Sequence, residues 1–216
     1  MNSENSSRQP RQDRSRATAE RLLNATISIL DESGLEGATI PRIAAVAEVA
    51  PASVYRRFAD KDALLRAAFL HTLRQSNQAN GQQLETLLLG NSLAATTGKL
   101  IGLLFDQYRQ HPHLLRALSR FIDTDSDQEF TREARAMIRA NVDLVVKVLL
   151  KHQDEISHAP PEPALRFAML NATCSIETFA LDPHSLWHVE PSISDRELAD
   201  RLAHSFVAYL RTPPAS

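Results

Sequence analysis

The sequence predicts an all-α protein. Apolar residues recur at the three- and four-residue spacing of helices along nearly the whole chain, and no segment shows the period-2 alternation of a strand. The 11 prolines cluster between these periodic segments, where helices end. With 216 residues and 43% hydrophobic content, the chain can bury a sizeable core, in one large domain or in two.

Three helices are expected before residue 60. The first covers about residues 14–33, and Gly34 follows it where a C-terminal cap belongs. Thr39 suits the N-cap of a short second helix, which has Pro41 in its first turn. A third short helix covers about residues 51–58. The apolar positions that should be buried in the first two helices are Leu22, Leu23, Ile27, Ile29, Leu30, Ile40, Ile43, Ala44 and Ala47.

Longer helices are expected in the rest of the chain. Asp60 is a suitable N-cap for a long helix that starts at Lys61. Further helices are expected at about residues 93–110, 112–121, 128–152, 162–179 and 194–211.

The charge is distributed unevenly. The net charge is −2, but residues 1–75 hold 11 Lys or Arg against 9 Asp or Glu, whereas the remainder holds 13 against 17. A basic N-terminal part on an acidic body favours a polyanionic partner at that end.

Residues 51–58, PASVYRRF, combine small, hydroxyl and guanidinium groups on one short helix. Two short helices joined by a tight turn, with the second rich in polar groups, are typical of a helix-turn-helix, whose second helix enters the DNA major groove. Close approach of the helix backbone to DNA requires small residues, and Pro51, Ala52 and Ser53 are small. Phosphates require hydrogen-bond donors, which Ser53 and Tyr55 supply. A guanidinium suits guanine, so Arg56 is the candidate for a base contact, with Arg57 as a second candidate for a base or a phosphate.

Cations and a hydroxyl flank this helix. Lys61 stands in the first turn of the next helix, where backbone amides already favour a phosphate. Thr39 and Arg42 are placed to reach the other side of the DNA backbone. Residues 1–13 are expected to form a flexible basic arm, which either contacts DNA or serves only for solubility. A solvated surface is the alternative for each arginine, and the sequence leaves open whether Arg56 or Arg57 reads a base.

The segment TIPRIAAVAEVAPASVYRRFADKDALL resembles the N-terminal DNA-binding motif of the TetR family of transcriptional repressors, and the preceding residues fit that family's first helix. The resemblance covers about residues 16–66. It departs from the family at the turn, where Glu48 replaces the usual glycine and Ala50 an often-seen serine. A glycine position there implies a left-handed backbone at Glu48, at a cost of about 1 kcal/mol.

The resemblance implies a helix-turn-helix domain over residues 14–60 and a larger helical domain over residues 61–216 for effector binding and dimerisation. A homodimer would pair the last two helices with their mates, although their apolar stripes could instead complete the chain's own core. The stripe residues are Leu165, Met169, Ala172, Ile176, Leu198, Leu202, Phe206 and Tyr209. The residues expected to line an effector pocket, or else to be plain core, are Phe69, Leu73, Leu103, Phe105, Tyr108, Met137 and Phe179.

Several functions find no support in the residues. No paired acids, nucleophile motif or glycine-rich phosphate loop appears, so no enzyme and no cofactor is expected. The single cysteine, Cys174, excludes an internal disulfide and favours a reducing, cytoplasmic setting. The histidine pairs His111/His113 and His184/His188 lack companion ligands at metal-binding spacing. No apolar run reaches the length of a membrane span.

The expected function is therefore a ligand-responsive repressor that binds a near-palindromic double-stranded DNA operator as a homodimer. A small molecule of unknown identity would release it. The alternative is a cytoplasmic helical ligand-binding or scaffold protein that no longer binds DNA.

Overall fold

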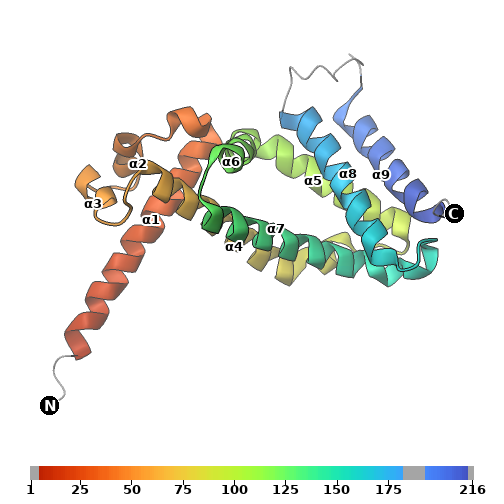
Figure 1. The fold of residues 1–216 in the computed structure, drawn as a ribbon, viewed down its shortest axis with the longest axis horizontal. Coiled ribbons are helices and arrows are strands. Elements are labelled where there is room, and N and C mark those ends of the chain that lie inside the picture. The colour runs from red at the N-terminus through yellow and green to blue at the C-terminus, as the bar shows by residue number, and fades with distance from the viewer. Residues whose placement is uncertain (1–4, 182–192, 214–216) are drawn as a thin grey trace. The chain divides into compact units, whose positions relative to one another are not determined.

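The computed structural model describes the backbone of residues 5–181 and 193–213, with side chains from Ser15 onward. Within these ranges the chain is helical and contains no strand, so the predicted all-α class is confirmed (Figure 1). None of the described helices combines the length and the apolar character that crossing a bilayer requires.

The chain divides into two compact units. Unit 1 consists of Met1–Arg74 and His113–Ala134, and unit 2 consists of Gln75–Pro112 and Arg135–Ser216. The sequence-based boundary at residue 60 marks the end of the predicted DNA-binding segment, and it stays a prediction. The boundary between the two compact units instead falls within the fourth helix, after Arg74.

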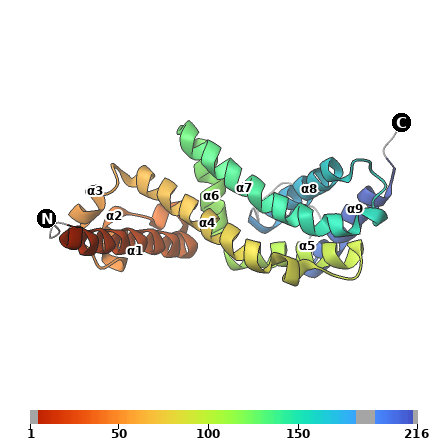
Figure 2. The same ribbon diagram turned by 90° about the horizontal axis from the view of Figure 1, so that it is seen from below.

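Unit 1 begins with three helices whose ends follow the local signals. Helix α1 (Asn5–Gly37) starts well before the expected residue 14, and Gly34 breaks it with a left-handed φ of 64°, as the cap position predicted. Helix α2 (Ile40–Val46) packs on α1, and α3 (Pro51–Tyr55) packs on α2 (Figure 2). The four expected apolar positions of the second helix, Ile40, Ile43, Ala44 and Ala47, are all buried.

The rest of unit 1 comes from parts of three further helices: α4 (Lys61–Leu88), α6 (Pro112–Thr124) and α7 (Gln128–Leu149). Three phenylalanines form its core here. The ring centroids of Phe69 and Phe121 lie 5.3 Å apart, and those of Phe121 and Phe130 lie 5.7 Å apart with the rings edge to face. Because all three side chains are buried, this cluster is hydrophobic core.

An ion pair fastens α4 to the start of α7. Arg66 Nε donates to Asp125 Oδ2 at 2.8 Å, and the Asp125 side chain is only 3% exposed. This hydrogen bond, followed by nearby carboxylates, raises the pKa of Arg66 above its ordinary value. Asp127 caps α7 through the amides of Glu129 and Phe130, which lowers the pKa of its carboxyl group.

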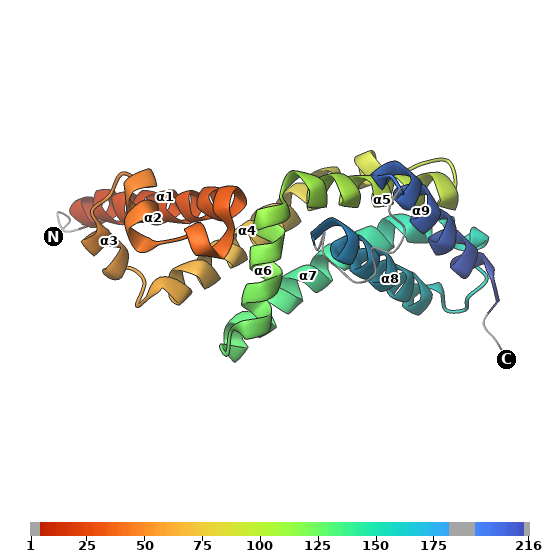
Figure 3. The same cartoon turned by 90° about the horizontal axis from the view of Figure 1, so that it is seen from above.

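Unit 2 is built around α5 (Leu93–Gln110), α8 (Pro161–Leu181) and α9 (Asp195–Arg211), which pack on one another (Figure 3). Parts of α4 and α7 complete it. Helix α7 ends earlier than expected, at Leu149, and a 3₁₀ segment, Leu150–Glu155, continues from it. The central side chains, Leu93, Ile101, Leu149, Leu165 and Ile176, are fully buried.

Glu155 joins three segments of unit 2. Its carboxylate accepts a 2.6 Å hydrogen bond from the amide of Leu93 at the start of α5, and it pairs with Arg211 at the end of α9. The Leu93 amide, followed by Arg211, lowers the pKa of Glu155 below its ordinary value of 4.5. The ionised carboxylate is therefore the form that stabilises the fold.

The lowered pKa of Glu155 makes the stability of unit 2 depend on pH. A carboxyl group whose pKa is lower in the folded state contributes stability above the unfolded pKa and loses it as pH falls through the folded pKa. We expect Glu155→Gln to lower the free energy of unfolding by about 1 kcal/mol at pH 7 and by progressively less below pH 4.5. Urea denaturation of both proteins at several pH values measures this, and a difference that is constant with pH would contradict it.

Candidate nucleic-acid interface and pocket

The turn between α2 and α3 holds a strained residue. The backbone of Glu48 has φ 54°, so the left-handed conformation predicted for this non-glycine residue is confirmed. Two hydrogen bonds close the turn, from the Glu48 amide to the Ala45 carbonyl at 3.1 Å and from the Val49 amide to the Ala44 carbonyl at 2.9 Å. No side chain caps α3, because Ala50 occupies its N-cap.

Relief of this strain should stabilise the protein. We expect Glu48→Gly to raise the free energy of unfolding by about 1 kcal/mol, because glycine adopts positive φ without steric cost. The measurement is chemical denaturation of the full-length protein, followed by the helical circular dichroism signal. Glu48→Ala is the matched control, since alanine keeps the Cβ and should give no gain. A lower stability for the glycine variant would refute the assignment of strain to this turn.

Helix α3 is held down by one side chain and exposes the others. Val54 is fully buried, and Phe58 beyond the helix is half-buried. Tyr55 is 59% exposed although it is aromatic. The other predicted contact residues in and just after this helix are exposed: Pro51, Ala52, Arg56 and Arg57. Ser53 is partly exposed.

The two adjacent arginines point in different directions. Arg56 Nη2 donates to Ser53 Oγ at 2.6 Å, so its guanidinium lies along α3 itself. Arg57 Nη1 instead donates to Ser15 Oγ on α1 at 2.8 Å. The sequence could not separate these two residues, because the distinction depends on where α1 lies.

The flanking residues are partly engaged with α1. Arg42 contacts Ser33 Oγ at 3.0 Å and pairs with Glu32 at 2.9 Å. Lys61 Nζ lies 3.5 Å from the Leu35 carbonyl oxygen, a long contact that a phosphate could replace. Thr39 is exposed at the N-cap of α2 and makes no side-chain capping bond.

Two other predicted features concern the first helix and the start of α4. The backbone is helical from Asn5, which includes most of the segment expected as an arm, while the side chains of Arg8, Arg11 and Arg14 lie outside the described residues. Asp60 does cap α4, because its Oδ1 accepts a 2.7 Å hydrogen bond from the Ala63 amide.

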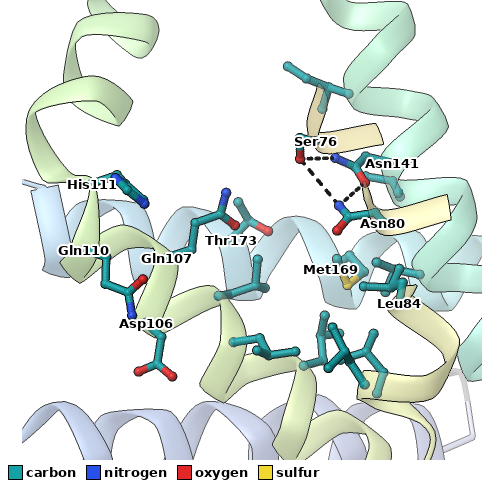
Figure 4. Close-up of a pocket in the computed structure, with 18 residues that line it drawn as sticks. Ser76, Asn80, Leu84, Asp106, Gln107, Gln110, His111, Asn141, Met169 and Thr173 are labelled. Carbon is teal, nitrogen blue, oxygen red and sulfur yellow. Dashed lines mark hydrogen bonds between the residues drawn. The ribbon is translucent and has the colours of Figure 1, made fainter. Parts of the chain in front are cut away.

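A pocket of about 510 Å³ opens within unit 2. It lies among α4, α5, α7 and α8, and just over half of its lining residues are apolar, among them Leu84 on α4, Val145 on α7 and Met169 on α8 (Figure 4). Polar side chains stand at two sides of it. Ser76, Asn80 and Asn141 gather at one side, and Gln107, Gln110 and His111 lie across from them on or just after α5.

The predicted pocket residues are mostly elsewhere. Only Leu103 lines this pocket. Phe69 is in the aromatic core of unit 1, and Leu73 also belongs to that unit. Phe105 and Phe179 pack ring against ring at 6.5 Å. The other two predicted residues also lie outside the lining: Tyr108, whose pKa burial raises to about 12, and Met137, whose carbonyl accepts from Asn77.

The polar residues of the pocket were missed for a physical reason. Ser76, Asn80 and Asn141 occupy positions on long helices where a sequence pattern indicates a solvated face. Only the packing of α4 against α7 brings them together.

The apolar stripes of the last two helices face inward. Leu165, Met169, Ala172 and Ile176 are all buried within the single chain, as is Phe206. These five residues belong to the chain's own hydrophobic core, and Leu198, Leu202 and Tyr209 pack against it half-buried. Ala172, Leu202, Phe206 and Tyr209 also border a groove between α8 and α9, so the pairing of these helices with a second copy stays a prediction. The large apolar side chains that α8 exposes are Phe167, 50% exposed, and Leu170, 58% exposed.

No group of three or more histidine, cysteine or acidic side chains in the described ranges is arranged to hold a metal ion. His184 and His188 lie outside those ranges. Cys174 is a free thiol on the exposed side of α8.

The N-terminal part of the chain is similar in sequence to known proteins. Residues 22–68 match the family of bacterial regulatory proteins called the tetR family. The HTH-type transcriptional regulator BetI of Paraburkholderia phytofirmans is 39% identical over 62 residues, which are 29% of this chain and 32% of that protein. BetI of Burkholderia thailandensis is 42% identical over 53 residues, which are 24% of this chain and 27% of that protein. The match thus spans about a third or less of these relatives.

Solved structures extend the similarity of fold to most of the chain. A tetR-family transcriptional regulator from Streptomyces coelicolor has a TM-score of 0.63 at 19% identity, over 89% of this chain and 79% of that one. FadR from Bacillus subtilis, in complex with stearoyl-CoA, has a TM-score of 0.62 at 13% identity, over 88% of this chain and 98% of that one. The helix-turn-helix sequence and the family match agree that residues 22–68 carry the DNA-binding segment of the tetR family of bacterial regulatory proteins, and the solved structures share the fold over most of the chain.

Proposed function

We propose that the protein is a repressor that binds a near-palindromic DNA operator as a homodimer, and that a small molecule in the pocket of unit 2 releases it. The observation that carries the DNA-binding part is the surface of α3. One fully buried residue, Val54, holds a helix whose small and polar side chains face solvent beside a strained tight turn. Such a helix presents its N-terminal residues to base edges in the major groove.

Each DNA contact has a proposed role. Pro51, Ala52 and Ser53 allow close approach of the α3 backbone, and Tyr55 donates its hydroxyl to a phosphate. Arg56 reads a guanine with its guanidinium. The cations and hydroxyl on either side of the helix bind the DNA backbone; they are Thr39, Arg42, Arg57 and Lys61.

Dimerisation is proposed because one recognition helix of five residues offers too few contacts for operator binding. The exposed Phe167 and Leu170 of α8 supply apolar surface for a second copy. A groove of about 290 Å³ between α8 and α9, lined by small residues such as Ala168, Asn171 and Ser175, supplies a concave surface. Two-fold symmetry would place the recognition helices about 34–36 Å apart, on successive major grooves.

Release by a ligand follows from population shift. A molecule that binds better to a conformation whose recognition helices are wrongly spaced lowers the population that fits the operator. A neighbour of the same fold is in complex with stearoyl-CoA, which supports a ligand-binding role for this protein. We propose no enzymatic activity, and we propose that the protein works in the cytoplasm, where its operator would lie.

The test is binding of the full-length protein to fluorescent duplexes enriched from a random pool, measured by anisotropy at several salt concentrations. We expect preference for a near-palindromic sequence and a linear fall of log affinity with log salt. Light scattering should show a dimer that Leu170→Glu dissociates. A protein without preference among duplexes would instead be a helical ligand-binding or scaffold protein, and the proposal would fail.

A further inference from the structure

The charge of the pocket lining restricts what the pocket binds. Of the lining residues that the structure describes, Asp106 is the one acidic or basic residue apart from His111, and no lysine or arginine is among them. Asp106 is exposed and lies apart from the group of Ser76, Asn80 and Asn141 (Figure 4). An anion brought into this pocket would lose its hydration without gaining a cationic partner, which is unfavourable.

A small polar network forms one side of the pocket. Asn80 Nδ2 donates to Asn141 Oδ1 at 2.7 Å, which fastens α4 to α7. Asn80 Nδ2 also lies 3.5 Å from Ser76 Oγ, and Asn141 Nδ2 lies 3.4 Å from the same oxygen. All three contacts join side chains that line the pocket (Figure 4).

The network leaves one donor and one acceptor available. Ser76 Oγ accepts from both asparagines, so its own hydroxyl proton remains to be donated. Asn80 uses its amide nitrogen in both contacts, and its carbonyl oxygen accepts no hydrogen bond from any described residue. A half-buried donor and acceptor side by side match a ligand group that both donates and accepts.

Next to this network the lining is aliphatic. Leu84 and Leu88 of α4, Val142 and Val145 of α7, Leu104 of α5 and Met169 of α8 border the same cavity. Its volume of about 510 Å³ falls within the range of small-molecule sites. The pocket therefore offers an apolar surface that ends in an uncharged hydrogen-bonding group.

We propose that the pocket binds an uncharged amphipathic molecule: an aliphatic chain that ends in a carboxamide or hydroxyl group held by Ser76 and Asn80. This inference rests on the proposed function only in naming the molecule as the effector. It separates this chain from its fold neighbour in complex with stearoyl-CoA, because coenzyme A carries several phosphate charges and this lining offers no cation to pair with them.

Binding of ten-carbon probes to the full-length protein, measured by isothermal titration calorimetry, tests the inference. The probes are decanamide, 1-decanol, decanoate, decyltrimethylammonium and decanoyl-CoA. We expect decanamide and 1-decanol to bind at least about tenfold more tightly than the three charged probes. Equal or tighter binding of any charged probe would overturn the proposal, and so would the absence of binding by both uncharged probes.

Paired variants locate the binding group. The double variant Asn80→Leu/Asn141→Leu replaces both partners of the central hydrogen bond with side chains of similar size, so it should fold. It should bind decanamide and 1-decanol at least about tenfold more weakly than the parent protein, whereas Gln78→Leu, at an exposed position of α4 outside the pocket lining, should bind them as the parent does. A double variant that folds by circular dichroism and binds decanamide as tightly as the parent would refute the assigned network.

The same preparation, without any probe, is titrated with operator DNA. Failure to bind DNA would overturn the proposed function while the probe preference stood. Normal DNA binding with no preference among the probes would overturn this inference alone.

Discussion

Phe69→Ala is expected to lower the free energy of unfolding by about 3–5 kcal/mol. The Phe69 side chain is fully buried, and its ring packs 5.3 Å from that of Phe121, which in turn packs on Phe130. Truncation removes the ring from the centre of this cluster and leaves a cavity that the surrounding helices fill only in part. Urea denaturation followed by circular dichroism measures the loss.

Val46→Ala is the control for this prediction. It truncates an apolar side chain of the same unit at a position that is 53% exposed, so it should change stability by less than about 1 kcal/mol. If Phe69→Ala leaves stability unchanged and weakens ligand binding instead, Phe69 lines a cavity and the core assignment fails.

Arg56→Ala is expected to reduce discrimination at one base pair of each half-site by about 1–3 kcal/mol. The Arg56 guanidinium lies along α3 next to Ser53, on the side that faces solvent, and Arg57 turns toward Ser15 on α1. A specific contact that is lost in both protomers should change the selected sequence and not only the affinity. Binding to a panel of singly substituted operators measures this.

Lys61→Ala supplies the comparison for Arg56→Ala. A lysine at the start of α4 that binds a phosphate contributes equally to all sequences, so its loss should weaken binding throughout the panel and reduce the salt dependence by about one charge per protomer. Arg57→Ala should likewise weaken binding without altering preference. If Arg57→Ala changes the preferred base and Arg56→Ala does not, the two roles are reversed.

The sequence predicted the helices and several of their ends because those depend on local signals, although α1 starts earlier and α3 and α7 end earlier than expected. Gly34 and Asp60 act at the helix ends where the pattern placed them, and Glu48 has the positive φ that its position implied. These features are determined by a few neighbouring residues, whose sterics and hydrogen bonds hold whatever the rest of the chain does.

The pocket and the buried stripes could not be predicted in the same way. Helical periodicity shows that Leu165 and Ile176 face something apolar, but it does not show whether the same chain or a second copy covers them. Phe69 is equally apolar as core or as pocket lining. Asn80 and Asn141 become a site only because helices about 60 residues apart in sequence pack together.

The aromatic cluster of unit 1 has a consequence for how such a protein can be cut or recombined. Phe69 comes from the first stretch of the unit, whereas Phe121 and Phe130 come from a second stretch that follows after residue 112. A fragment ending after α4, or a chimera that exchanges everything beyond it, would leave the Phe69 ring without its covering partners. The first stretch of unit 1, which contains the recognition helix, and the later stretch that carries Phe121 and Phe130 should therefore be transplanted together.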